Sequence, residues 1–145
     1  MPPHCDTMDG PVVKAARQAL EAGDVKLVLP YVHKAGEAEV SEAFRRAVQA
    51  RQAGAAAKEV ADLYFFETVV RIHRSGEGAP YTGLKPAGLS EGPIIPVAEK
   101  AIESGSPDEL VSMLSKAVSE SVLHRFHHLQ DLKKHADENV DRARD

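Results

Sequence analysis

The sequence predicts an all-α fold, and three observations carry that prediction. Aromatic residues make up only 5% of the chain and Trp is absent, so Ala, Val and Leu must fill the core. Such a core favours close helix packing over aromatic-rich strands. Apolar residues also recur at helical spacing, as in Val40, Phe44, Ala47 and Val48. We expect a helical bundle of four main helices, with one or two short extra helices and a long Gly/Pro loop.

The first helix is expected over residues 12–22. Pro11 suits its first turn, and Gly23 ends it. Asp24 can cap the next segment, residues 25–29. That segment is one or two helical turns or a short extended piece, and helix is favoured.

Two consecutive helices are expected over residues 37–53 and 55–74, with Gly54 between them. Residues 75–92 follow and hold five Gly and two Pro. Irregular segments of this length are often functional in a compact domain. We expect this loop to fold over one end of the bundle with Tyr81 packed beneath it, and it lacks the glycine and lysine spacing of a phosphate-binding loop.

Two more helices are expected after the loop. The first runs from Pro93 to the glycine at position 105. The second should begin with Ser106 as a hydroxyl cap, and Glu109 should complete a capping box. A single domain is therefore expected over residues 1–135, followed by a polar, frayed tail at residues 136–145.

Charge and composition narrow the classes of partner. The net charge is −4, from 22 acidic and 18 basic side chains, and no run of Lys or Arg exceeds two residues. Nucleic acid is therefore not an expected partner. No apolar stretch reaches the length of a membrane span, and the first residues do not form a signal peptide. The single cysteine rules out an internal disulfide, so a cytoplasmic location is expected. Neither a small-molecule substrate nor assembly into a homo-oligomer is excluded by the sequence.

The first candidate site is the segment that contains His4, Cys5 and Asp6. Imidazole, thiol and carboxylate groups lie close together here, just before the first helix. A helix N-terminus favours negative charge, which lowers the pKa of a nearby thiol. Imidazole and thiolate ligands suit zinc, iron, nickel or copper. His4 and Cys5 are candidate metal ligands, Cys5 is also a candidate nucleophile, and the alternative is an exposed tail with a bystander cysteine.

The second candidate site lies on the helix at residues 55–74. Leu63, Phe66 and Val70 define an apolar face, and helical geometry places Glu67 and His73 on either side of it. Glu67 is expected to be part buried, which would require a partner or a metal. Both residues are candidate metal ligands and catalytic groups. The alternative is structural, with Glu67 paired one turn on and His73 capping the helix end.

The third candidate site is a histidine cluster in the last helix. His124 and His128 are four positions apart and His124 and His127 three apart, so either pair can chelate one ion if another helix supplies more ligands. His124 and His128 are the favoured metal ligands. The alternative is a polar helix end in which charged histidines interact with the helix macrodipole. His33 and His135 are expected to be ordinary surface residues.

Two stretches resemble an uncharacterised prokaryotic family that is known only as a domain of unknown function. They are the opening His4-Cys5-Asp6-Thr7-Met8-Asp9-Gly10-Pro11-Val12 and the block from Phe65-Phe66-Glu67-Thr68 to Gly88. The resemblance extends to about Leu129 and implies no activity.

The opening His4-Cys5-Asp6 is also similar to the start of mature nickel superoxide dismutases, which are helical bundles with an N-terminal nickel hook. That resemblance implies a metal held by a similar hook. The second cysteine of the hook is replaced here by Asp9, and His4 is not the first residue. The same redox chemistry is therefore not expected.

The first hypothesis is a helical bundle that binds a transition metal or a metal-containing cofactor at its core. Its ligands would come from the N-terminal segment, the Glu67 and His73 helix, and the His124 to His128 turn. Redox or small-molecule chemistry at the metal is then favoured over hydrolysis of a polymer. The second hypothesis is a non-catalytic interaction module with structural histidines, and the third is a metal-free enzyme that uses Cys5 with His73.

Overall fold

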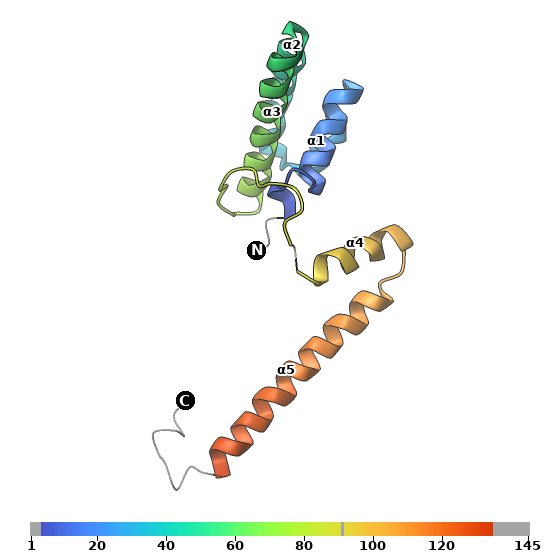
Figure 1. The fold of residues 1–145 in the computed structure, drawn as a ribbon, viewed down its shortest axis with the longest axis vertical. Helices are drawn as coiled ribbons and strands as arrows, with labels where there is room; N and C mark the ends of the chain where they lie inside the picture. The colour runs from blue at the N-terminus through green and yellow to red at the C-terminus, as the bar shows by residue number, and fades with distance from the viewer. Residues whose placement is uncertain (1–3, 91, 135–145) are drawn as a thin grey trace. The chain divides into compact units, whose positions relative to one another are not determined.

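The computed structural model describes residues 4–90 and 92–134, and this part of the chain is helical, as the sequence predicts. The α-helices are α1 (Pro11–Ala22), α2 (Glu37–Ala50), α3 (Ala55–Gly76), α4 (Ile94–Ser104) and α5 (Asp108–Lys134) (Figure 1). The shorter 3-10 turns are η1 (His4–Asp6), η2 (Val25–Leu27), η3 (Leu29–Tyr31), η4 (Lys34–Gly36) and η5 (Arg51–Ala53). The helices group into two compact units, residues 1–91 and 92–145. A single domain over residues 1–135 stays a prediction, and the expected frayed tail and His135 lie outside the described residues.

The helix boundaries follow the expected local signals. Pro11 occupies the first turn of α1, and Gly23 ends the helix in the left-handed region, with φ 69°. The Asp24 carboxylate accepts a hydrogen bond from the Lys26 amide (2.9 Å), so it caps η2 as predicted. The segment after Asp24 is helical but forms two separate turns, η2 and η3, with Val28 between them and Pro30 in the first turn of η3.

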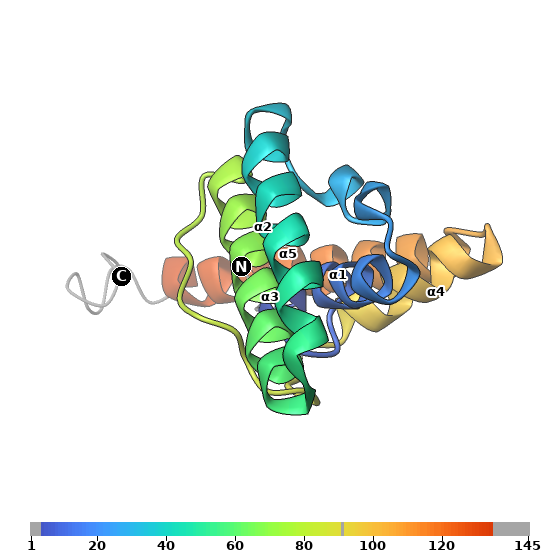
Figure 2. The ribbon, with the colours of Figure 1, turned by 90° about the horizontal axis from the view of Figure 1, so that it is seen from above.

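The first unit is built on the packing of α2, α3 and α1. Figures 1 and 2 show α2 and α3 side by side, connected through η5 and Gly54. Gly54 has a φ of 114°, a backbone conformation that side chains with a Cβ rarely adopt. The Arg51 guanidinium donates to the Leu20 carbonyl (2.5 Å), which holds the end of α1 against η5.

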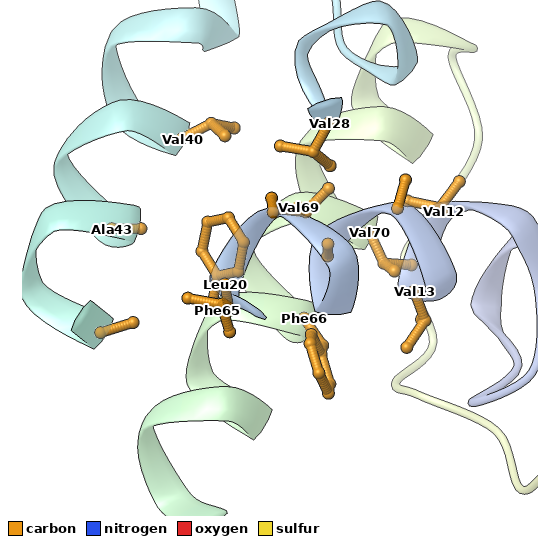
Figure 3. Close-up of a cluster of buried hydrophobic side chains, with 14 of the residues drawn as sticks. Val12, Val13, Leu20, Val28, Val40, Ala43, Phe65, Phe66, Val69 and Val70 are labelled. Atoms are coloured by element: carbon orange, nitrogen blue, oxygen red, sulfur yellow. The ribbon is translucent and has the colours of Figure 1, made fainter. Parts of the chain in front are cut away.

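The core of the first unit is made mostly of Val and Ala, together with Leu20, Ile72 and two phenylalanines (Figure 3). Phe65 and Phe66 are both buried in α3, and Phe65 meets Phe44 of α2 edge to face with 5.6 Å between ring centroids. The Arg17 guanidinium of α1 lies 5.0 Å from the centre of the Phe66 ring. Three of the four phenylalanines of the chain therefore lie where the helices of the first unit meet.

The second unit consists of α4 and α5. Gly105 ends α4 in the left-handed region, and the Ser106 hydroxyl accepts a long hydrogen bond from the Asp108 amide (3.4 Å) at the start of α5. The Glu109 carboxylate accepts a hydrogen bond from the Lys100 ammonium group of α4 (2.7 Å). Glu109 therefore forms an ion pair with α4 in place of the predicted capping-box contact with Ser106. None of the helices in residues 4–90 and 92–134 combines the length and the apolar character that a membrane span requires.

Candidate functional site

A polar cluster forms where the N-terminal segment, the end of α3 and the Gly/Pro loop meet. The Arg74 guanidinium of α3 lies 2.7 Å from the Asp6 carboxylate, and both side chains are buried. Arg74 also lies 2.8 Å from the Glu77 carboxylate. Burial alone would lower the pKa of Arg74, but its hydrogen bond to Asp6, then the charge of Asp6, and then Glu77 raise that pKa above its usual value. The pair is a buried contact that fixes the N-terminal segment to α3.

The Gly/Pro loop also binds the N-terminal segment. The Met8 amide donates to the Lys85 carbonyl (3.0 Å), and the Lys85 amide donates to the Asp6 carbonyl (2.8 Å). The Asp9 carboxylate accepts a hydrogen bond from the Gly88 amide (2.8 Å). This hydrogen bond, followed by the contact with the Thr7 hydroxyl in the N-terminal segment, lowers the pKa of Asp9. The loop therefore closes over the start of the chain, as a loop folded over one end of the helices should.

This arrangement requires a glycine at position 10, because the atoms around this position leave no room for a side chain. A Cβ atom at this position would lie 2.1 Å from the His4 carbonyl oxygen and 2.8 Å from the Thr7 hydroxyl. The Thr7 hydroxyl itself donates to the His4 carbonyl (3.2 Å). The segment from His4 to Gly10 is thus a tight turn within the first unit.

His4 and Cys5 lie next to each other in η1, and both are half-buried. The Cys5 sulfur is 3.7 Å from Nδ1 of His4. A tetrahedral zinc ion with Zn–S of about 2.3 Å and Zn–N of about 2.0–2.1 Å holds its sulfur and nitrogen ligands about 3.6 Å apart. The separation therefore suits two ligands on one ion, and it also suits a thiol–imidazole hydrogen bond.

Both ring nitrogens of His73 lie near oxygen atoms of the first unit. Its Nδ1 is 2.7 Å from the Tyr31 carbonyl oxygen of η3, and its Nε2 is 3.5 Å from the Glu77 carboxylate. Glu77 connects it in turn to Arg74. These contacts favour the structural alternative for His73, since they tie the end of α3 to η3.

Glu67 is exposed, so the prediction that it is part buried is wrong. The buried side of α3 includes Phe65, Val69 and Val70, and helical geometry puts Glu67 beyond its edge, about 60° past Val70. Leu63, expected on the apolar face, is also exposed. Tyr81 packs beneath the loop as predicted, and burial, followed by the negative charge of Glu67, raises the pKa of Tyr81.

His124, His127 and His128 are exposed on α5 in the second unit. His127 lies 6.4 Å from the Phe126 ring, measured between ring centroids. Within residues 4–90 and 92–134, no three His, Cys, Asp or Glu side chains converge in an arrangement that could hold a metal ion. A shared metal pocket formed by the three predicted groups stays a prediction, as do the roles of Cys5, Glu67 and His73 as catalytic groups.

Sequence reasoning missed Arg74 and Glu77 as members of the polar cluster. The pattern contained a signal for Arg74, because Phe66, Val70 and Arg74 are spaced four apart on one face. A charged residue that continues a buried apolar row needs a buried partner of opposite charge. That partner, Asp6, could not be identified from spacing because it is 68 positions away.

The first unit also has an open apolar groove between α2 and α3. Its walls are mostly alanine side chains, and Val60 and Tyr64 are the larger exposed residues in it. Arg46 is the charged residue at its edge. The groove offers apolar contact area and few groups for chemistry.

Comparison with known protein families gives a match over most of the chain. A family model described as "Family of unknown function (DUF6448)" matches residues 9–145. No curated protein and no solved structure matches the chain. The matched range begins at Asp9, so His4 and Cys5 lie outside it.

Proposed function

The chain belongs to this family of unknown function, and we propose that it acts as a non-catalytic protein-interaction module whose contact surface is a row of apolar side chains on α5. The α5 apolar row consists of Val111, Leu114, Val118, Val122, Phe126 and Leu129. These side chains are 39–63% exposed. This single observation carries the proposal.

Helical geometry puts the whole row on one side of the helix. At 100° per residue, the six positions fall within about 120° of arc. An apolar stripe of that width is the kind of face that a helix buries against a partner. Contiguous apolar surface of this kind on a protein marks an interaction site more often than isolated exposed residues do.

The partner helix in the same unit covers a different part of α5. Leu110 and Met113 are half-buried beside α4, whereas Val118 and Val122 further along are 63% and 60% exposed. α4 is 11 residues long and α5 is 27, and Figure 1 shows α5 continuing well past α4. Most of the row is therefore left without a covering element in its own unit.

The polar cluster of the first unit supports a scaffold role. Asp6, Arg74, Glu77 and His73 form a continuous series of contacts that hold η1, α3 and η3 together. The Gly/Pro loop is bound to the N-terminal segment, so α5 is a better contact surface than this loop. Together with the apolar groove between α2 and α3, these features favour docking over catalysis.

The test compares two lysine substitutions on opposite sides of α5. Val122→Lys places a charge in the row, and His127→Lys places the same charge about 140° around the helix. Far-UV circular dichroism of the protein at low concentration should give the same helix content and the same Tm for both variants. A Val122→Lys variant that alone loses helix content and unfolds at a much lower, concentration-independent Tm would contradict the proposal, because the row would then be internal core.

A second candidate function is supported by the Cys5–His4 contact. The 3.7 Å separation suits two ligands of a soft transition metal such as zinc, iron, nickel or copper. His4 and Cys5 would hold the ion, and it would supply Lewis-acid or redox chemistry to a small-molecule substrate. Metal analysis of tag-free protein tests this candidate: stoichiometric metal that Cys5→Ser abolishes supports it, whereas metal-free protein or metal retained in Cys5→Ser contradicts it.

A further inference from the structure

We infer that the partner of the α5 apolar row is the same row of a second copy of this chain, aligned antiparallel. The inference rests on the proposed function and adds the identity of the partner and the register. Three features of α5 support it: the symmetry of the row, the distribution of charge along the helix, and the length of the row.

The row is symmetric about Glu120. Val118 and Val122 are each two positions from it, and the row repeats this match outward, with Leu114 against Phe126 and then Val111 against Leu129. The successive spacings are three, four, four, four and three residues, the same in either direction. An antiparallel second copy therefore places every apolar side chain of the row opposite an apolar side chain. The resulting contact is isologous, because each copy presents the same surface.

Charge selects the antiparallel alignment. Residues 108–121 carry three acidic side chains and one basic side chain, whereas residues 122–134 carry three basic and one acidic. The charged residues within about 60° of the centre of the row are Asp108, Arg125 and Lys133. Antiparallel copies place Asp108 of one helix next to Lys133 of the other and also oppose the two macrodipoles favourably. Parallel copies would put like charges together along the whole helix.

The position of Arg125 also favours the antiparallel alignment over the parallel one. Helical geometry places it within the 120° arc of the row, about 40° around the helix from Leu129. In the antiparallel register Arg125 lies opposite Ser115 of the second copy, which is small and neutral. In a parallel register it would lie opposite Arg125 of the second copy, which is repulsive.

The row is long enough for a stable contact. It covers 18 residue steps, or about 27 Å of helix, within the 27 residues of α5. Two copies contribute twelve apolar side chains, each already at least 39% exposed before association. A continuous helix pair of this length is the usual arrangement for two amphipathic helices with matched apolar rows.

Cysteine cross-linking of the full chain tests the alignment. In a Cys5→Ser background, one variant carries Val111→Cys and another carries Leu129→Cys. Under oxidation, the mixture of the two should give a disulfide-linked dimer that contains one copy of each. Leu129→Cys alone should stay monomeric on a non-reducing gel, because its two sulfurs lie about 27 Å apart in the antiparallel pair. Efficient cross-linking of Leu129→Cys alone would overturn the antiparallel alignment.

Association itself is tested by sedimentation equilibrium. Val122→Lys puts two charges into the contact because the pair is symmetric, so its dimer dissociation constant should rise at least about tenfold. His127→Lys should leave it unchanged. A dimer that Val122→Lys does not weaken would overturn the inference.

The two proposals fail in different ways. A wild-type chain that stays monomeric at all concentrations, with Val122→Lys as stable as His127→Lys, overturns the second copy as partner and leaves the row available to another protein. A monomeric wild type with Val122→Lys markedly less stable overturns both, because the row is then covered within the chain.

Discussion

The Arg74 guanidinium and the Asp6 carboxylate lie 2.7 Å apart, although 68 positions separate them in the sequence. Both side chains are buried, so the contact fixes the segment from His4 to Asp9 against the end of α3. The Gly/Pro loop then closes over the same segment through Lys85 and Gly88. The polar cluster thereby holds the N-terminal segment, the end of α3 and the Gly/Pro loop together.

Breaking this ion pair on one side should destabilise the first unit strongly. Arg74→Met leaves the Asp6 carboxylate buried without its counterion, which costs about 3–5 kcal/mol. Urea unfolding followed by circular dichroism measures the loss. The double variant Asp6→Leu/Arg74→Met should recover most of it, because no unpaired charge remains buried and Glu77, the other partner of Arg74, is exposed to solvent. A single variant as stable as the wild type would show that the pair is not buried in solution.

Gly10→Ala should loosen the N-terminal segment. The new Cβ would lie 2.1 Å from the His4 carbonyl oxygen, so residues 4–9 must shift, at a cost of about 1–3 kcal/mol. Gly23→Ala is the control, because its Cβ meets nothing within 4 Å and the cost comes only from a φ of 69°. Amide hydrogen exchange should accelerate in residues 4–9 for Gly10→Ala only. Equal exchange in both variants would contradict the tight turn.

The contact between Asp9 and the loop should be lost in acid. The folded-state pKa of Asp9 is lowered, first by the Gly88 amide, so the contact contributes stability above the ordinary pKa of 3.8. That contribution disappears as pH falls through the lowered value. The NMR chemical shift of the Gly88 amide should therefore titrate with a midpoint below 3.8. In Asp9→Ala the transition should be absent, and a midpoint at or above 3.8 would argue against the hydrogen bond.

Tyr81 should produce the opposite pH dependence in alkali. Burial and then the charge of Glu67 raise its folded-state pKa above the usual 10.0, so the folded state retains the phenol proton longer than the unfolded chain does. The corresponding stability is complete below pH 10 and is lost as pH rises through the raised pKa. Tyrosinate absorbance and Tm, compared between the wild type and Tyr81→Phe, measure both effects. A wild type whose Tm falls no faster than that of Tyr81→Phe above pH 10 would exclude this effect.

Local signals in the sequence were sufficient for much of the fold. Proline and glycine at the ends of α1, Gly54 between α2 and α3, and Gly105 after α4 act within a few residues, so the boundaries they predict are confirmed. The resemblance to an uncharacterised family is also confirmed. The helix boundaries depend on local backbone conformation, which the neighbouring residues largely determine.

Contacts between distant segments were not predictable in the same way. Helical periodicity places the apolar face of α3 around Leu63, Phe66 and Val70. Phe66 and Val70 are buried, but packing against both α1 and α2 also buries Phe65 and Val69 and leaves Leu63 exposed. Glu67 is consequently exposed. A single helix periodicity cannot show which of two adjacent phenylalanines faces the core when, as here, both are buried.

The α5 apolar row had a partial signal in the sequence. Val111, Val118, Val122 and Leu129 form a stripe distinct from the one that contains His124 and His128. The pattern identifies an apolar stripe, but it does not identify the element that covers it. Only the three-dimensional structure shows that α4 is too short to lie beside most of the row (Figure 1).

The central claim is that the α5 apolar row joins two copies of the chain, and sedimentation equilibrium of the untagged wild type tests it most directly. The predicted result is a concentration-dependent mass that approaches twice the 15.7 kDa of the chain, with Val122→Lys remaining near the monomer mass under the same conditions. A wild type that keeps the monomer mass at every concentration would contradict the claim.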